Sequence, residues 1–187
     1  MVKGKENKPV VLQVLPELEM GGVEIGTVEI AGGMQKHGIT NFVASQGGRL
    51  VYDLEKIRVG HLTLPLKTKN IFKMRKNADK LAQFIRENGI NIVHARWAAK
   101  KAGIHYMTTF HGTYGLGPWG LKKLYNRVMT YGERVIAISE HIKRHILANY
   151  KISEDKIRLV HRCVNTEKFS PEAVTPERMI NTVRDYN

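Results

Sequence analysis

Four short groups of residues in this 187-residue sequence have types and spacing that could bind a ligand or act on it. Gly21-Gly22 follows an apolar run and could open a helix, where backbone N–H groups and the helix dipole attract a phosphate. His111, just past another apolar run, could donate to a sugar hydroxyl or a phosphate, or act as a base. Arg96 could contact an anionic ligand, and Ser139 precedes a further helical pattern.

Each of these groups also has a purely structural interpretation. Gly21-Gly22 could form a plain tight turn, which we favour for the glycine pair taken alone. Ser139 is explained fully as a helix N-cap, and Arg96 as an ordinary surface residue. For His111 the functional interpretation and a packed loop histidine are equally supported by the residues themselves.

Several other kinds of ligand site find no support. The sequence contains neither G-x-G-x-x-G nor a Walker A motif, which disfavours a nicotinamide dinucleotide or P-loop site. His141 and His145 are one helical turn apart, but Lys143 and Arg144 lie between them and no His-Glu pattern supports a metal site. The single cysteine, Cys163, has no obvious base partner and is interpreted as an inert thiol. We therefore expect no metal and no resident cofactor.

The elements that must position these residues alternate between strand-like and helical patterns. Short apolar runs predict seven strands, at residues 10–15, 41–45, 61–66, 91–94, 104–110, 134–138 and 157–160. The clearest helix carries an apolar stripe made of Ile71, Met74, Ala78, Leu81, Ala82 and Ile85. Other helices are expected after Gly21-Gly22, around residues 121–128, after Ser139 and at residues 176–183. This order predicts an α/β fold, a Rossmann-like parallel sheet with helices on both faces that binds ligands at the carboxyl ends of its strands.

The pattern is interrupted at two places. Residues 95–103, which separate the fourth strand from the fifth, are fewer than the dozen or so that a parallel crossover needs. Either these strands are not parallel neighbours, or the crossover is unusually tight, or part of a helix has been lost and residues 97–102 form a stub. The second interruption is the C-terminus, where a strand and turn lead to little further sequence, so we expect a truncated chain.

The charge of the chain favours an anionic partner. Lys and Arg number 30 against 17 Asp and Glu, a formal net charge of +13. This balance fits nucleic acid, an acidic membrane surface or a phosphorylated substrate, but also a merely solvated basic surface. Basic residues gather at 67–76, yet no zinc-finger spacing or aromatic RNA-binding motif points to specific nucleic-acid binding. The single cysteine and the lack of a long apolar run predict a cytoplasmic protein without a transmembrane segment.

Five segments in this order resemble family 4 retaining glycosyltransferases. VLQVL at 11–15 followed by ELEMGGVE at 17–24 resembles the opening of that family. IVHAR at 92–96, TFHGTY at 109–114 and RVIAIS at 134–139 resemble its successive strand ends, and residues 157–169 resemble the hinge into a second domain. Over most of residues 9–170 the chain is similar to bacterial lipopolysaccharide-core sugar transferases.

The resemblance implies the N-terminal, acceptor-side half of a GT-B fold. It implies a nucleotide-sugar donor, with Gly21, Gly22 and Ser139 near the donor phosphates and His111 at the reacting sugar. It implies a glycolipid acceptor, bound by Arg96, Thr113 and Tyr114. It needs no metal. It also implies work at the cytoplasmic face of the inner membrane, where the basic charge suits a peripheral contact with anionic lipid.

The domain layout expected on this basis is a basic tail at residues 1–8, the Rossmann-like domain at 9–162, and a hinge with the truncated start of a second domain at 163–187. The sequence departs from the family at the shortened crossover and at Cys163-Val164-Asn165, where the family has Gly-Val-Asp. The donor-gripping glutamates of the second domain are also missing, so we expect this chain alone to be inactive. The alternative is a non-catalytic module that binds anionic lipid or a separately encoded partner.

Overall fold

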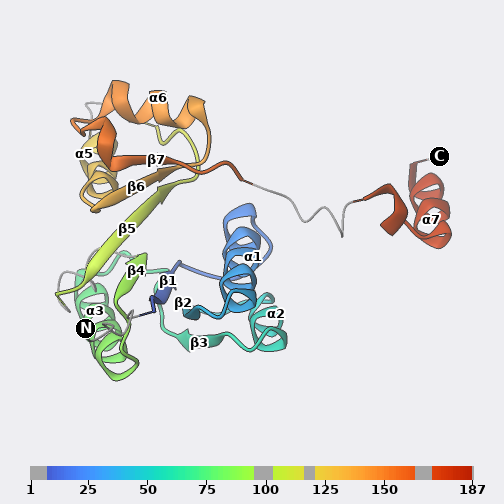
Figure 1. Cartoon of the computed structure of the whole chain (residues 1–187), viewed down its shortest axis with the longest axis horizontal. Helices are drawn as coiled ribbons and strands as arrows, with labels where there is room; N and C mark the ends of the chain where they lie inside the picture. The colour runs from blue at the N-terminus through green and yellow to red at the C-terminus, as the bar shows by residue number, and fades with distance from the viewer. Residues whose placement is uncertain (1–7, 95–102, 116–120, 163–169, 187) are drawn as a thin grey trace, which may run out of the picture.

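Seven strands form one parallel sheet in the order β3-β2-β1-β4-β5-β6-β7 (Figure 1). The computed structural model describes residues 8–94, 103–115, 121–162 and 170–186. The strands are β1 (Val10–Val14), β2 (Thr40–Ser45), β3 (Gly60–Thr63), β4 (Ile92–His94), β5 (His105–Phe110), β6 (Arg134–Ala137) and β7 (Ile157–Leu159). All seven predicted strands and the predicted Rossmann-like α/β class are thereby confirmed.

Six α-helices flank the sheet or follow it along the described chain. They are α1 (Gly22–Lys36), α2 (Val51–Lys56), α3 (Ile71–Glu87), α5 (Leu121–Asn126), α6 (Glu140–Asn149) and α7 (Pro176–Tyr186). The short helix α2 was not predicted from the sequence. Helix α7 is amphipathic and its described side chains are exposed; Figure 1 shows it apart from the sheet.

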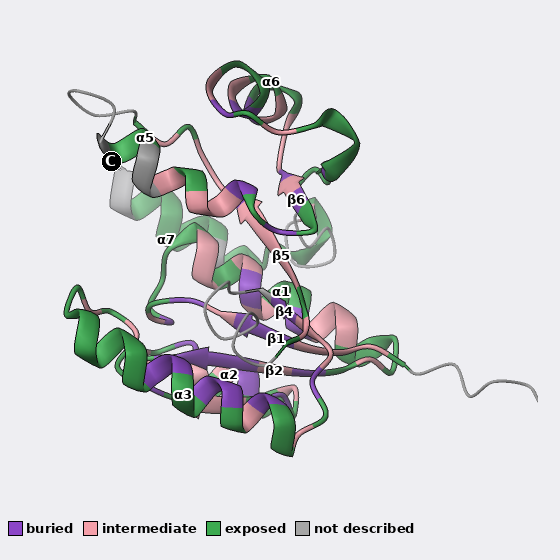
Figure 2. Cartoon of the chain, turned by 90° about the vertical axis from the view of Figure 1, so that its left-hand side faces the viewer, coloured by how far each residue is buried: buried purple, intermediate pink, exposed green. Residues whose placement is uncertain are grey.

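Alternation along the strands sends successive side chains to opposite faces of the sheet. On one face, Val43 of β2 packs with Ala31 of α1 and Leu54 of α2. On the other face, Leu12 and Val93 pack with Leu81 and Ile85 of α3. The same face continues through β5 and β6 to the cluster that α6 covers, where Phe110, Val135 and Ile146 are fully buried. Helices therefore cover both faces, as the sequence predicts (Figure 2).

Strand β5 joins two parts of the sheet. It pairs in parallel with β4 through Ile92–His105 and Val93–Tyr106, and with β6 through a longer register. Figure 1 shows β5 running from the β1–β4 part of the sheet to the β6–β7 part. The parallel pairing excludes the first alternative for the short crossover, that β4 and β5 are not neighbours. The predicted stub at residues 97–102 lies outside the described residues.

The apolar stripe of α3 is longer than the core that it covers. Ala78, Leu81, Ala82 and Ile85 are buried as predicted. Ile71 and Met74, the first two members of the predicted stripe, are instead 68% and 40% exposed. The physical reason is position, because the first turns of α3 extend past the buried contacts of the sheet.

We predict that Phe110→Ala lowers the free energy of unfolding by about 3–5 kcal/mol. Phe110 is 0% exposed, and its ring lies 5.5 Å from that of Tyr114 and 5.7 Å from that of Tyr150. The matched control is Phe72→Ala on α3, where a ring that is 80% exposed leaves no cavity. Urea unfolding followed by circular dichroism measures both variants, and equal losses of stability would contradict this description of the core.

Candidate functional site

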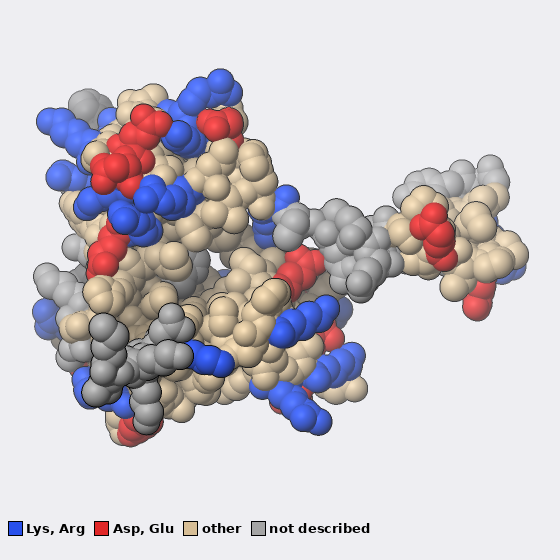
Figure 3. All heavy atoms as spheres, viewed as in Figure 1, with Lys and Arg blue, Asp and Glu red and all other residues tan. Residues whose placement is uncertain are grey.

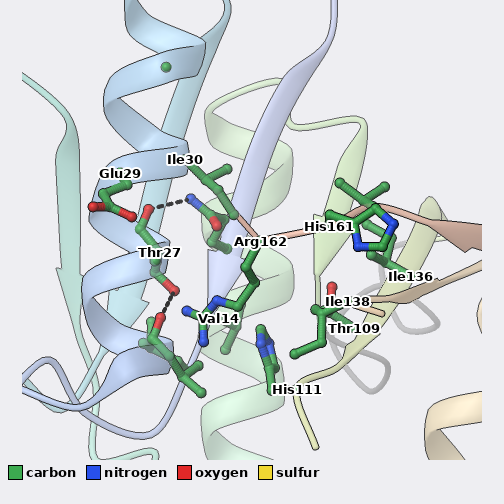
Figure 4. A pocket seen from close by; sticks show the side chains of 16 residues that line it. Val14, Thr27, Glu29, Ile30, Thr109, His111, Ile136, Ile138, His161 and Arg162 are labelled. Carbon is green, nitrogen blue, oxygen red and sulfur yellow. Dashed lines mark hydrogen bonds between the residues drawn. The ribbon is translucent and has the colours of Figure 1, made fainter. Parts of the chain in front are cut away.

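A cavity of about 360 Å³ lies between α1 and the carboxyl-end region of β1, β5 and β6. Its apolar walls come from Val14, Ile30, Ile136, Ile138 and Val160. Thr109, Ile136 and Ile138 line the cavity on the side that faces α1. Figure 3 shows a hollow between the β5–β7 part of the molecule and α1, and Figure 4 shows the lining side chains.

Helix α1 presents a surface with little side-chain bulk to this cavity. Gly21 is its N-cap without a side-chain cap, and Gly26 and Gly33 line the cavity further along. The helix is anchored by Gln13 of β1, whose buried side-chain amide donates to the Thr27 carbonyl at 3.3 Å. The glycines therefore let a ligand or another side chain approach the backbone of α1 closely.

Arg162, which follows β7, reaches across the cavity to α1 (Figure 4). Its guanidinium donates a hydrogen bond to the Gly22 carbonyl. The same guanidinium lies where a Cβ atom on Gly26 would be, so a side chain there would displace it. Arg162 thus connects the segment after the last strand to the first turns of α1 and places a positive charge in the cavity.

His111 lies at the carboxyl end of β5 and also lines the cavity. Its pKa is lowered from the usual 6.5, first by burial and second by the positive charge of Arg162. Its Nδ1 atom is buried and has no hydrogen-bond partner among the described residues. At neutral pH the imidazole is therefore uncharged.

Glu24 places a carboxylate at the first turn of α1. One of its oxygens, Oε2, is buried and finds no hydrogen-bond partner among the described residues. A Cβ atom on Gly21 would collide with this carboxylate, so Glu24 folds back over the N-cap. A carboxylate here is favoured by the helix dipole, and it can accept a hydrogen bond from a ligand hydroxyl.

These groups give the cavity a mixed chemical character. The guanidinium of Arg162 attracts an anion, whereas the neutral His111 and the carboxylate of Glu29 can bind hydroxyl groups. Glu24, at the first turn of α1, is not among the lining residues. The other lining residues are mainly apolar, with the polar side chains of Gln13, Thr27, Thr109 and His161 among them. The arrangement suits a ligand that carries a phosphate or another anion next to a polyhydroxylated group.

The structure brings some of the sequence-predicted residues together and separates others. His111 shares the cavity with Val23 and Gly26 of α1, whereas Gly21 and Gly22, at the start of that helix, are not among the lining residues. Tyr114 instead packs against Phe110 in the α6-side cluster, and Thr113 is exposed. Ser139 is not among the lining residues; it caps α6, accepting a hydrogen bond from the Ile142 amide at 3.2 Å. Arg96 lies outside the described residues.

Sequence reasoning missed Arg162, Gly26 and the role of the Glu24 carboxylate. Arg162 has no motif around it, and its contact with Gly22 spans 140 residues of sequence. The available signal was topological, because the residue after β7 must emerge at the same edge of a parallel sheet as His111. Gly26 was hidden because a glycine inside a helical pattern first indicates a weak helix.

Two absences among the described residues bear on the class of site. No three His, Cys, Asp or Glu side chains in that part of the chain are grouped so that they could hold a metal ion. None of the described helices is long and apolar enough to cross a membrane. The absence of a metal from the site stays a prediction. Cys163, which the sequence analysis interprets as an inert thiol, lies outside the described residues.

Solved structures with the same architecture were found in several bacteria. A glycosyltransferase from Rickettsia africae ESF-5 is 39% identical to this chain, with a TM-score of 0.80. The match covers 96% of this chain and 50% of the Rickettsia chain. HepE from Anabaena, solved with UDP and glucose, is 14% identical with a TM-score of 0.73, covering 95% of this chain and 50% of its own. UDP-GlcNAc 2-epimerase from Neisseria meningitidis, solved with UDP-GlcNAc, is 18% identical with a TM-score of 0.55, covering 95% and 52%. The likeness to HepE and to the epimerase, at 14% and 18% identity, shows the fold alone.

This chain spans about half the length of the solved structures that it matches. A comparison with curated proteins gives no match. The sequence model of Glycosyltransferase Family 4 matches residues 20–168, which include α1, every strand after β1, and His111 and Arg162 in the cavity. The chain therefore belongs to Glycosyltransferase Family 4, and its parallel sheet is the N-terminal half of a GT-B fold.

Proposed function

We propose that this chain is the acceptor-side half of a transferase that moves a sugar from a nucleotide-sugar to a lipopolysaccharide-core or similar glycolipid. The observation that carries the proposal is the cavity in which His111 and Arg162 face the first turns of α1. Family membership supports the reaction class. The UDP and glucose in HepE, and the UDP-GlcNAc in the epimerase, support a UDP-sugar as the donor class.

The donor diphosphate belongs at the start of α1 in this proposal. The backbone N–H groups of Gly21 and Gly22 and the dipole of α1 attract it, and Arg162, which is bonded to the Gly22 carbonyl, adds a positive charge. Ser139 contributes through its hydroxyl hydrogen, since its oxygen already caps α6. Glu24 opposes the phosphate charge, so its carboxylate is assigned to a sugar hydroxyl rather than to the diphosphate.

His111 is assigned to the reacting sugar. Because burial and Arg162 keep the pKa of its imidazole below 6.5, it meets the sugar uncharged and can accept or donate one hydrogen bond. An uncharged imidazole does not repel the positive charge that develops on a sugar ring during transfer. The acceptor is assigned to Arg96, Thr113 and Tyr114, on the segments that follow β4 and β5.

The acceptor is a glycolipid in this proposal, so the protein works next to a membrane at the cytoplasmic face. The net charge of +13 supports a peripheral contact with anionic lipid. The parallel sheet is one half of a GT-B fold, which supports a transferase site completed by a second domain. The 187-residue chain alone is therefore expected to transfer negligible sugar.

We predict that joining residues 1–162 to the second half of the Rickettsia africae glycosyltransferase produces sugar transfer that the chain alone lacks. In this chimaera His111→Ala lowers kcat by at least about 100-fold, because a positioned hydrogen bond at the reacting centre is lost. The measurement is release of UDP from a UDP-sugar in the presence of glycolipid acceptor.

The matched control for this experiment is His141→Ala, which removes an exposed histidine on α6 outside the cavity. It should leave kcat unchanged. A chimaera as active with His111→Ala as without it would remove His111 from the mechanism. Measurable transfer by the 187-residue chain alone would refute the expectation that the site is divided between two domains.

We predict that Arg162→Ala raises the pKa of His111, because one of the two causes that lower it is removed. Gly26→Ala should raise this pKa as well, since its Cβ atom takes the place of the guanidinium beside α1. Gly33→Ala is the matched control, because its Cβ atom would meet nothing within 4 Å. NMR titration of the imidazole resonances measures all three variants, and an unchanged pKa in Arg162→Ala would contradict the charge contact.

The same shift has a consequence for stability. The folded-state pKa of His111 is lowered, so the unfolded chain binds a proton more readily and stability falls as pH drops below about 6.5. Arg162→Ala should reduce this loss of stability on acidification, as urea unfolding at pH 7 and pH 5 would show.

A further inference from the structure

The first turns of α3 form an exposed surface of apolar and basic side chains. Ile71, Phe72 and Met74 are 68%, 80% and 40% exposed, and the basic side chains among them are exposed as well. We call this surface the α3 patch, and it consists of Lys69, Ile71, Phe72, Lys73, Met74, Arg75 and Lys76. Large apolar side chains exposed side by side are typical of an interaction site.

The patch is held in an ordered helix and kept out of the core. The Asn70 side chain caps α3, accepting hydrogen bonds from the Phe72 amide at 2.9 Å and the Lys73 amide at 3.1 Å. The buried contacts of α3 begin at Asn77, whose side chain donates to the Pro65 carbonyl at 2.8 Å. Figure 2 shows exposed residues over one end of α3 and buried residues further along. The patch is therefore a fixed, helical surface beyond the sheet.

The charge of this segment indicates what would cover it. Residues 67–80 contain six Lys or Arg and one Asp. Lys67 is held by Glu17 at 2.8 Å, which leaves five basic residues on the segment besides it. A surface of apolar side chains surrounded by cations matches a lipid bilayer with anionic headgroups, where the apolar groups enter the interface and the cations meet phosphates.

We propose that the α3 patch docks this protein on an anionic membrane surface, with Ile71 and Phe72 in the headgroup region and Lys73, Arg75 and Lys76 on lipid phosphates. The inference deepens the proposed function and rests on it for its purpose, since a glycolipid acceptor resides in a membrane. Its occupant is the lipid surface itself, and no other protein is required.

The position of the patch fits this purpose. Helix α3 begins after the carboxyl end of β3, at the same edge of the parallel sheet where α1 follows β1 and His111 follows β5. The ion pair of Lys67 with Glu17 joins the segment before α3 to the segment before α1. Docking through the patch therefore brings the edge that carries the cavity towards the lipid surface.

The experiment is co-sedimentation of the full 187-residue chain with vesicles. Vesicles of equal parts phosphatidylglycerol and phosphatidylcholine should bind the chain, and vesicles of phosphatidylcholine alone should bind far less. Lys73→Gln with Lys76→Gln should weaken binding about 25-fold, from about fivefold for each cation removed near an anionic surface. Phe72→Ser should weaken it too, because an exposed aromatic ring no longer enters the interface.

Matched controls separate the patch from the overall charge. Lys122→Gln with Lys123→Gln removes the same charge from exposed positions on α5, and Ile180→Ser removes an exposed apolar side chain from α7. Both controls should leave vesicle binding within about twofold of the wild type. All altered side chains are exposed, and circular dichroism checks that each variant keeps the fold.

Three results would overturn the inference. Equal losses for the α3 and α5 pairs would show that the overall charge alone drives binding. Equal binding to vesicles with and without phosphatidylglycerol would show that the chain does not recognise anionic lipid. No binding to either vesicle would show that the α3 patch is not a membrane docking surface. The proposed transferase function would still be tested separately by the chimaera, whose assay needs no vesicle.

Discussion

Within the described residues, the pairs Ile92–His105 and Val93–Tyr106 join β5 to β4, and through β5 they join β6 and β7 to the rest of the sheet. Because this pairing is parallel, the carboxyl ends of β1, β5 and β6 meet at one edge. His111 and the start of α1 face the same cavity for that reason. The contact of Arg162 with Gly22 is a second connection between the two parts, made through side chains across the cavity. A change that shifts β5 would alter both the sheet and the candidate site.

The electrostatics of the cavity follow from the side chains that this geometry brings together. The guanidinium of Arg162 lies against the first turns of α1, in the same cavity as the His111 imidazole, which burial and Arg162 hold uncharged. The glycines of α1 are needed for this crowding, since a Cβ atom on Gly26 would take the place of the guanidinium. Glycine at position 26 lowers the stability of α1 by about 1 kcal/mol relative to alanine. Without this glycine, the guanidinium of Arg162 could not take its place beside α1.

The sequence was sufficient to predict the parallel α/β class, all seven strands and the family, because each rests on local periodicity and on motifs at strand ends. It also indicated His111, which follows a well-marked strand. It could not indicate Arg162, because the partner of this residue is distant in sequence and the contact depends on how the sheet closes. It grouped the exposed Ile71 and Met74 with the buried members of the α3 stripe, because periodicity gives the face of a helix but not how far the sheet extends beneath it. Tyr114 shows a related limit, since its packing against Phe110 depends on the path of the chain after β5.

The central claim is that the edge of the sheet around His111 and the start of α1 is a nucleotide-sugar site. The most direct test is an NMR titration of the isotopically labelled chain with UDP, with uridine as the ligand that lacks phosphate. We expect UDP to shift the backbone amide signals of Gly21, Gly22 and Gly112 and the ring signals of His111, and uridine to shift them much less. Shifts confined to other surfaces, or equal shifts with uridine, would contradict this claim.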